Sequence, residues 1–152
     1  MITVEGQGWT QEESKVLRMA VEEMSTLGTP FKVVPNGGDV VVRSAKFWPC
    51  TRHSVGQFVI GSRLIEVDPL CTEDNSYLQQ AFMHELGHFI GMRHILRTPS
   101  DVGVFLSPLP PAPAVMNPNM YYGDGVPFLP ATTTFTSSDL EEYWLVSSSH
   151  QF

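Results

Sequence analysis

Hydrophobic residues recur along the chain at two spacings, and the change between them marks the predicted elements. Apolar side chains at three- and four-residue steps between residues 11 and 27 predict an amphipathic helix, which Gly28 and Pro30 end. Thr10 and Glu13 form the pattern of an N-terminal capping box. A second helix is predicted over residues 75–90. A third follows Thr136, which Asp139 complements as a capping pair.

Short runs with strand character lie at residues 2–4, 31–34, 40–43, 55–60 and 63–67. Gly61-Ser62 between the last two runs predicts a tight hairpin. Four or five strands, mostly early in the chain, together with three helices predict a layered α+β domain. The length of 152 residues fits one domain over residues 1–152.

Composition narrows the possible functions. The chain is 42% hydrophobic and 16% charged, which disfavours a disordered protein. Nine Lys and Arg against 16 Asp and Glu give a net charge of -7, which argues against a nucleic-acid partner. No apolar run approaches the roughly 20 residues that span a bilayer, and no signal peptide is visible. We therefore expect no membrane partner and a monomer.

The two cysteines, Cys50 and Cys71, cannot form a four-cysteine metal site. They can form one disulfide, because the predicted strands between them fold back on each other. We favour this interpretation over two buried free thiols. A disulfide would indicate an oxidising compartment.

The segment from His84 to His94 carries the candidate chemistry. His84 and His88 are four residues apart, so on a helix both imidazoles face one metal ion. Gly91 can take the left-handed conformation that ends a helix, and His94 then supplies a third ligand. Glu85 lies beside the metal without binding it, where a general base is needed.

Three neutral imidazoles leave a fourth position on zinc open for water, which is typical of a catalytic site. Zinc lowers the pKa of that water to about 7. Glu85 would take its proton and return it to a leaving amine. Three of the five histidines fall on this spacing, which disfavours a helix with ordinary surface histidines. His53 and His150 have no partner at ligand spacing.

The extended pattern resembles that of the metzincin clan of zinc endopeptidases, and Ala114-Val115-Met116-Asn117-Pro118 resembles the methionine turn of its matrixin family. The resemblance implies an α+β zincin fold with a mixed, twisted sheet of four to five strands and three helices, in which a Met-turn follows the active-site helix. It also implies one catalytic Zn²⁺, Met116 beneath the ligands, a peptide or protein substrate and a secreted protein. The chain departs from matrixins in the 22 positions from His94 to Met116, which contain a Pro-rich insertion. It also lacks a cysteine-switch motif.

Clan members bind an extended peptide along an edge strand. The candidate strand residues are Val55, Gly56, Gln57, Phe58 and Val59, and Tyr121 and Tyr122 are candidates for lining the cleft. An ordinary structural role stays equally open for each of them. Calcium is a further possibility, but a solvated turn is the favoured interpretation of the acidic residues Asp68, Glu73 and Asp74.

The resulting hypothesis is a zinc-dependent endopeptidase that hydrolyses peptide bonds through a water bound to the three-histidine zinc site and activated by Glu85. Two alternatives are a non-catalytic zinc-containing protein-binding module and a zinc amidase that acts on a non-protein substrate. The intact Glu85 favours catalysis, because a binding module has no need of that carboxylate.

Overall fold

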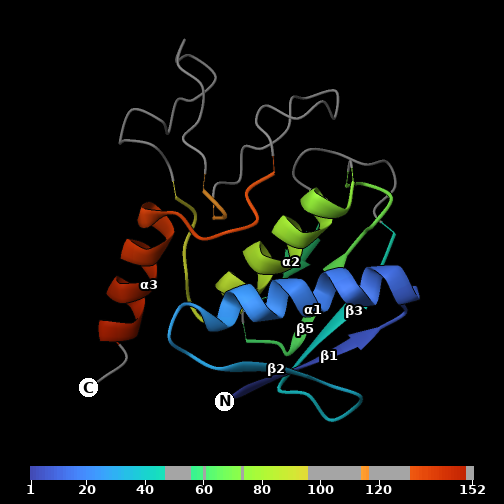
Figure 1. Ribbon diagram of the computed structural model, residues 1–152. Coiled ribbons are helices and arrows are strands. Elements are labelled where there is room, and N and C mark those ends of the chain that lie inside the picture. The colour runs from blue at the N-terminus through green and yellow to red at the C-terminus, as the bar shows by residue number, and fades with distance from the viewer. Residues whose placement is uncertain (47–55, 60, 73, 96–113, 117–130, 150–152) are drawn as a thin grey trace.

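The structure, a computed structural model, describes residues 1–46, 56–59, 61–72, 74–95, 114–116 and 131–149. Its elements in chain order are β1 (Ile2–Gln7), α1 (Gln11–Ser25), β2 (Phe31–Val34), β3 (Val40–Ser44), β4 (Gly56–Phe58), β5 (Leu64–Val67), α2 (Asn75–Phe89) and α3 (Ser137–Ser149). Figure 1 shows their arrangement. The predicted α+β class is confirmed, with five strands and three helices in the described part of the chain.

The five strands form one mixed sheet in the order β2-β1-β3-β5-β4. Each neighbouring pair is parallel except β4 and β5, which pair antiparallel as the predicted hairpin requires. Gly61 in that hairpin has φ +86°, a conformation that favours glycine. β4 is an edge strand of this sheet. It pairs with β5 on one side, and no other described strand pairs with its outer side.

Two strands differ from the predicted lengths by more than one residue. β1 continues to Gln7, because its second half pairs with β3 up to Arg43. The sequence did not reveal this extension, because that half of the strand is polar and carries no hydrophobic pattern. β4 is confined to Gly56–Phe58, and the exposed Val59 lies outside it. Val55 lies outside the described residues.

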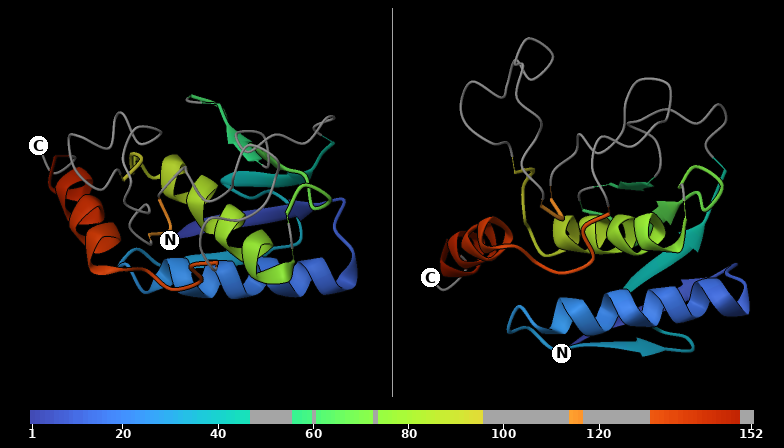
Figure 2. Two further views of the ribbon diagram at one scale, coloured as in Figure 1. Left: turned by 90° about the horizontal axis from the view of Figure 1, so that it is seen from above. Right: turned by 45° about the horizontal axis from the view of Figure 1, so that its top comes forward.

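The first helix begins as predicted. The Thr10 amide donates to Glu13 Oε1 at 2.9 Å, and the Glu13 amide donates to Thr10 Oγ1 at 3.1 Å. α1 buries Leu17, Val21 and Met24 against the sheet and α2. Figure 2 shows α1 and α2 side by side over the same face of the sheet, with α3 at one side.

The second helix is the centre of the molecule. Asp74 caps it by accepting from the amides of Ser76 and Tyr77, and every residue from position 77 to 87 is buried. On the side toward α1 and the sheet, Phe82 packs edge-on against Trp9, with ring centroids 4.9 Å apart. The Trp9 indole N–H donates to the carbonyl of Val42 at 2.8 Å. The core therefore fixes the helix that carries the candidate ligands.

Among the described residues, no helix combines the length and apolar character that crossing a membrane needs.

Candidate metal centre

Three histidines converge on one point. His84 and His88 lie one turn apart on α2, and His94 follows the end of that helix. Their Nε2 atoms form a triangle in which each of the three separations is 3.1 Å. In the described part of the chain, these residues form the one cluster of three or more His, Cys, Asp or Glu side chains that could hold a metal ion.

The end of α2 brings the third histidine into place. Gly91 has φ +94°. Its amide donates to the carbonyl of His88, and the amide of Met92 donates to the carbonyl of Gly87. This pair of bonds is a Schellman motif, which reverses the chain at the helix end. The predicted left-handed turn at Gly91 is therefore present, and it directs His94 back toward the helix.

Carbonyl oxygens orient two of the imidazoles. Nδ1 of His84 lies 2.8 Å from the carbonyl oxygen of Val115, and Nδ1 of His88 lies 2.9 Å from that of Met92. A carbonyl oxygen only accepts, so each Nδ1 carries the proton and donates. The Nε2 lone pairs of both rings are left to face the centre of the triangle, as metal ligation needs.

The spacing of the nitrogens fits zinc. Tetrahedral zinc with bonds of 2.0–2.1 Å separates two nitrogen ligands by about 3.3–3.4 Å. The observed separations of 3.1 Å differ from that by about 0.3 Å or less. His84 is buried while His94 is exposed, so the site opens to solvent on the His94 side.

Loss of contact with water favours the neutral form of the three imidazoles, most strongly for the buried His84 and less for the more exposed His94. It lowers the pKa of His84 from 6.5 to about 3, with a smaller contribution from the neighbouring His88. It also lowers the pKa of His88 and of His94. Neutral imidazole is the form that binds a metal ion, so protons do not compete with the metal at neutral pH.

Glu85 is a buried carboxyl beside this cluster. It is 8% exposed, and burial raises its pKa from 4.5 to about 7. Gly56 of β4 lies directly against it, because a Cβ at that glycine would stand 3.3 Å from Glu85 Cγ. The carboxyl therefore lies between the ligand helix and the edge strand, with a pKa suited to both taking up and releasing a proton near pH 7.

Residues 114–116, which we call the 114–116 turn, pack beneath the ligands. Met116 is fully buried, and a Cβ at Gly87 would stand 2.6 Å from its sulfur. The carbonyl of Met116 accepts from the amide of Ile95, one residue after the third histidine, at 2.9 Å. The turn therefore contacts both α2 and the segment that carries His94.

Sequence reasoning missed the role of Asp139, which it read only as part of a helix cap. The buried carboxylate accepts from the amides of Val115 at 2.9 Å and Met116 at 3.1 Å. It also accepts from the amide and hydroxyl of Thr136, which confirms the capping pair. One side chain therefore begins α3 and holds the 114–116 turn, a long-range contact that only the fold reveals.

Glu142 is a second residue that the sequence did not single out. Its buried carboxylate accepts from the backbone amide of Arg93 at 2.9 Å and from the guanidinium at 3.0 Å. This pairing raises the pKa of Arg93. Because Arg93 stands between Met92, which orients His88, and the ligand His94, the ion pair ties α3 to the ligand segment.

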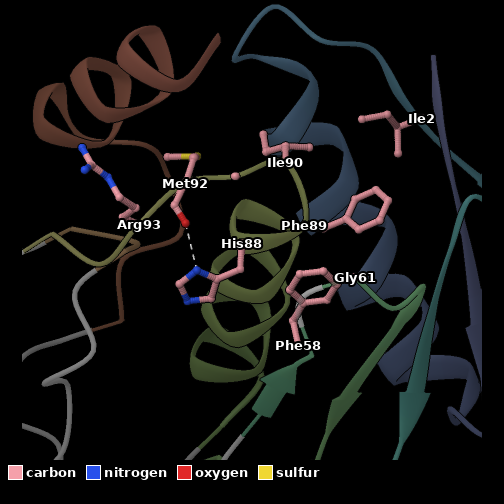
Figure 3. Close-up of a pocket in the computed structure, with 9 residues that line it drawn as sticks. Ile2, Phe58, Gly61, His88, Phe89, Ile90, Met92 and Arg93 are labelled. Atoms are coloured by element: carbon pink, nitrogen blue, oxygen red, sulfur yellow. Dashed lines mark hydrogen bonds between the residues drawn. The ribbon is translucent and has the colours of Figure 1, made fainter. Parts of the chain in front are cut away.

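A largely apolar cavity of about 760 Å³ adjoins the cluster at the end of α2. Figure 3 shows His88 at one wall, with Phe58 of β4 and Phe89 of α2 nearby. The two phenylalanine rings meet edge to face, with centroids 5.8 Å apart. The structure thus brings two of the predicted substrate-binding residues, Gly56 and Phe58, beside Glu85 and this cavity respectively.

The other predicted residues are placed less closely. Gln57 is exposed on β4, and its amide donates to Glu66 of β5 at 3.0 Å. Tyr121 and Tyr122 lie outside the described residues, and so does Cys50. The pairing of Cys50 with Cys71 and the lining of the cleft by the tyrosines stay predictions.

Comparison with known proteins defines the fold. No protein-family model matches the chain, and no curated protein matches it. Two solved structures of myroilysin are similar, with TM-scores of 0.61 and 0.60 and identities of 15% and 16%. They cover 96% of this chain, which in turn covers 82% and 79% of theirs.

Archaemetzincin from Archaeoglobus fulgidus, complexed with malonate, aligns with a TM-score of 0.48 and 12% identity, covering 93% of this chain and 98% of its own. The likeness to myroilysin shows a shared fold, an α+β arrangement of a five-stranded mixed sheet with three helices in the described part of the chain.

Proposed function

We propose that this protein is a zinc-dependent endopeptidase in which His84, His88 and His94 hold one zinc ion and Glu85 is the general base. The observation that carries the proposal is the triangle of Nε2 atoms 3.1 Å apart, with a buried carboxyl on the residue next to the first ligand. The zincin fold supports it, because the same helix in that fold presents both the ligands and the base.

Zinc, when bound, lowers the pKa of a water to about 7 and polarises a carbonyl. Glu85 takes the proton of the attacking water on a carboxylate oxygen and later gives it to the nitrogen of the leaving amine. Burial, which raises the pKa of Glu85 to about 7, stabilises the protonated form that the second step needs. The carbonyls of Val115 and Met92 keep His84 and His88 oriented throughout.

The edge strand supports a peptide substrate. A peptide that pairs with the outer side of β4 passes Glu85, because Gly56 lies against that side chain. Phe58 is two residues further along the strand, about 7 Å away, and lines the apolar cavity. We propose that this cavity receives an apolar substrate side chain two or three positions from the cleaved bond.

The test is cleavage of a mixed peptide library by the zinc-loaded protein, read by mass spectrometry, with Glu85→Gln as the matched control. We expect the wild type to cut and the variant to keep its zinc and lose cutting by several orders of magnitude. Equal cutting by both would remove Glu85 from the mechanism. One bound zinc with no cutting by the wild type would favour a protein-binding module, or an amidase for a non-protein substrate.

We further propose a matrixin-type enzyme that acts outside the cell, with a disulfide between Cys50 and Cys71. The methionine-turn sequence from Ala114 to Pro118 and the two cysteines support this. Met116 at the base of the ligand cluster is consistent with the proposed type.

A further inference from the structure

Gln80 is a buried amide whose two ends have different partners. It is 1% exposed. Its Nε2 donates to the carbonyl of Ala114 at 3.3 Å, and its Oε1 accepts from the backbone amide of Thr132 at 2.7 Å. One side chain of α2 therefore joins the start of the 114–116 turn to the segment that leads into α3.

The 114–116 turn follows α2 in register. Gln80, His84 and Gly87 lie on one stripe of the helix, four and then three residues apart. Gln80 contacts Ala114, His84 contacts the carbonyl of Val115, and Gly87 faces Met116. Three consecutive residues of the turn thus pair with three consecutive positions of the stripe, and Gln80 makes the first of these contacts.

We propose that Gln80 is a positioning residue of the metal centre. By holding the carbonyl of Ala114, it fixes the next peptide unit, so that the carbonyl of Val115 stays in line with Nδ1 of His84. That hydrogen bond sets the tautomer and the direction of the first ligand. The proposal rests on the zinc site of the proposed function, but only its activity readout needs hydrolysis, so the metal readouts test Gln80 separately from catalysis.

The chemistry at position 80 requires an amide of this length. The carbonyl of Ala114 needs a donor and the amide of Thr132 needs an acceptor, and a primary amide supplies both. An apolar side chain would leave both groups without their partner in a buried place, which is costly. Asn has the same chemistry but is one methylene shorter, so it cannot reach both partners at these distances.

The experiment compares Gln80→Met with Gln79→Met, in the full chain. Gln79 is the adjacent residue and is 7% exposed, and its hydrogen bonds within the described part of the chain are long, 3.5 Å to the carbonyl of Thr133 and 3.9 Å to the sulfur of Met83. It therefore controls for loss of a buried amide on α2 without contact to the 114–116 turn. The readouts are zinc affinity by chelator competition, the visible spectrum of the cobalt-substituted protein, and kcat/KM on a cleaved peptide.

We expect Gln80→Met to lower zinc affinity about 10-fold or more and to change the cobalt spectrum, as loss of an outer-shell partner does. Gln79→Met should stay within about 2-fold of the wild type in affinity. Wild-type affinity and spectrum in Gln80→Met, or equal losses in both variants, would overturn the proposal. If Gln80→Met does not fold, Gln80→Asn is measured instead and is expected to show the same losses. A wild type that binds zinc but cleaves no peptide would reject the proposed function and leave the metal readouts decisive for Gln80.

Discussion

Gly87 lies between His84 and His88 on α2. We predict that one added methyl group at this position displaces Met116, which packs against this part of the helix. A Cβ at this position would stand 2.6 Å from the sulfur of Met116 and 3.1 Å from its terminal methyl. It would also stand 3.5 Å from the sulfur of Met92. Because non-bonded atoms attract best at about 3.5–4.0 Å, the sulfur of Met116 must move by roughly 1 Å in Gly87→Ala.

Two opposing effects set the magnitude. Alanine is favoured over glycine inside a helix by about 1 kcal/mol. Overpacking a well-packed interior costs about 1–3 kcal/mol, and Met116 is fully buried, so it has little room to move. Gly87→Ala should therefore lower the free energy of unfolding by about 0–2 kcal/mol in the wild-type background.

The assay is a double-mutant cycle with Met116→Ala, measured by urea unfolding of the zinc-loaded protein. Met116→Ala alone should cost about 2–5 kcal/mol, because it removes a buried side chain. Without the methionine sulfur, Gly87→Ala keeps only its helix gain and should stabilise the protein by about 1 kcal/mol. The effect of the same substitution should thus be more favourable by about 1–3 kcal/mol in the Met116→Ala background than in the wild type. An identical effect in both, within about 0.5 kcal/mol, would refute the packing argument.

Two further predictions rest on described residues, and a third rests on the sequence. Asp139→Asn keeps the shape of the side chain but turns its NH₂ group toward one of the two backbone amides that now donate to the carboxylate. We therefore expect the free energy of unfolding in urea to fall by about 2–4 kcal/mol. A fall below about 0.5 kcal/mol would contradict the role of that carboxylate. In the metal-free protein, the pKa of Glu85 is raised from 4.5 to about 7, so the folded state holds the extra proton and stability due to this group is present below pH 4.5 and lost as pH rises to 7. The difference in unfolding free energy between wild type and Glu85→Gln should fall by about 1.4 kcal/mol per pH unit in that window, and a flat difference would show that the carboxyl is not desolvated. Reduction and alkylation should add two alkyl groups to the mass if Cys50 and Cys71 are bridged, whereas alkylation without reduction should add none; labelling of both thiols before reduction would reject the bridge.

Local patterns explain why so much of the site was predictable. The capping box at Thr10, the four-residue step from His84 to His88 and the glycine that ends α2 each depend on residues within one or two helical turns. The physics that fixes them acts over the same short stretch of sequence, so spacing alone is enough to place them.

The supporting contacts were not predictable, because their partners are distant in the chain. Asp139 reaches the 114–116 turn across 23 and 24 positions, Glu142 reaches Arg93 across 49, and Gln80 reaches Thr132 across 52. In sequence each looks like an ordinary polar residue on a helix. Only the folded structure, in which α3 contacts the 114–116 turn and Arg93 while the turn contacts α2, shows that these side chains are buried and paired.

The compactness of the ligand set has a consequence for the unfolded chain. His84, His88 and His94 span ten positions. Bringing the ends of so short a segment together costs little loop-closure entropy, which grows only with the logarithm of the length. If these histidines hold zinc as proposed, we expect the denatured chain to retain some affinity for it, and binding to the unfolded state reduces the stabilisation that a metal gives to the folded one. Zinc should thus stabilise the fold by less than its affinity for the native site indicates, and a titration of the urea-denatured chain with zinc measures the difference.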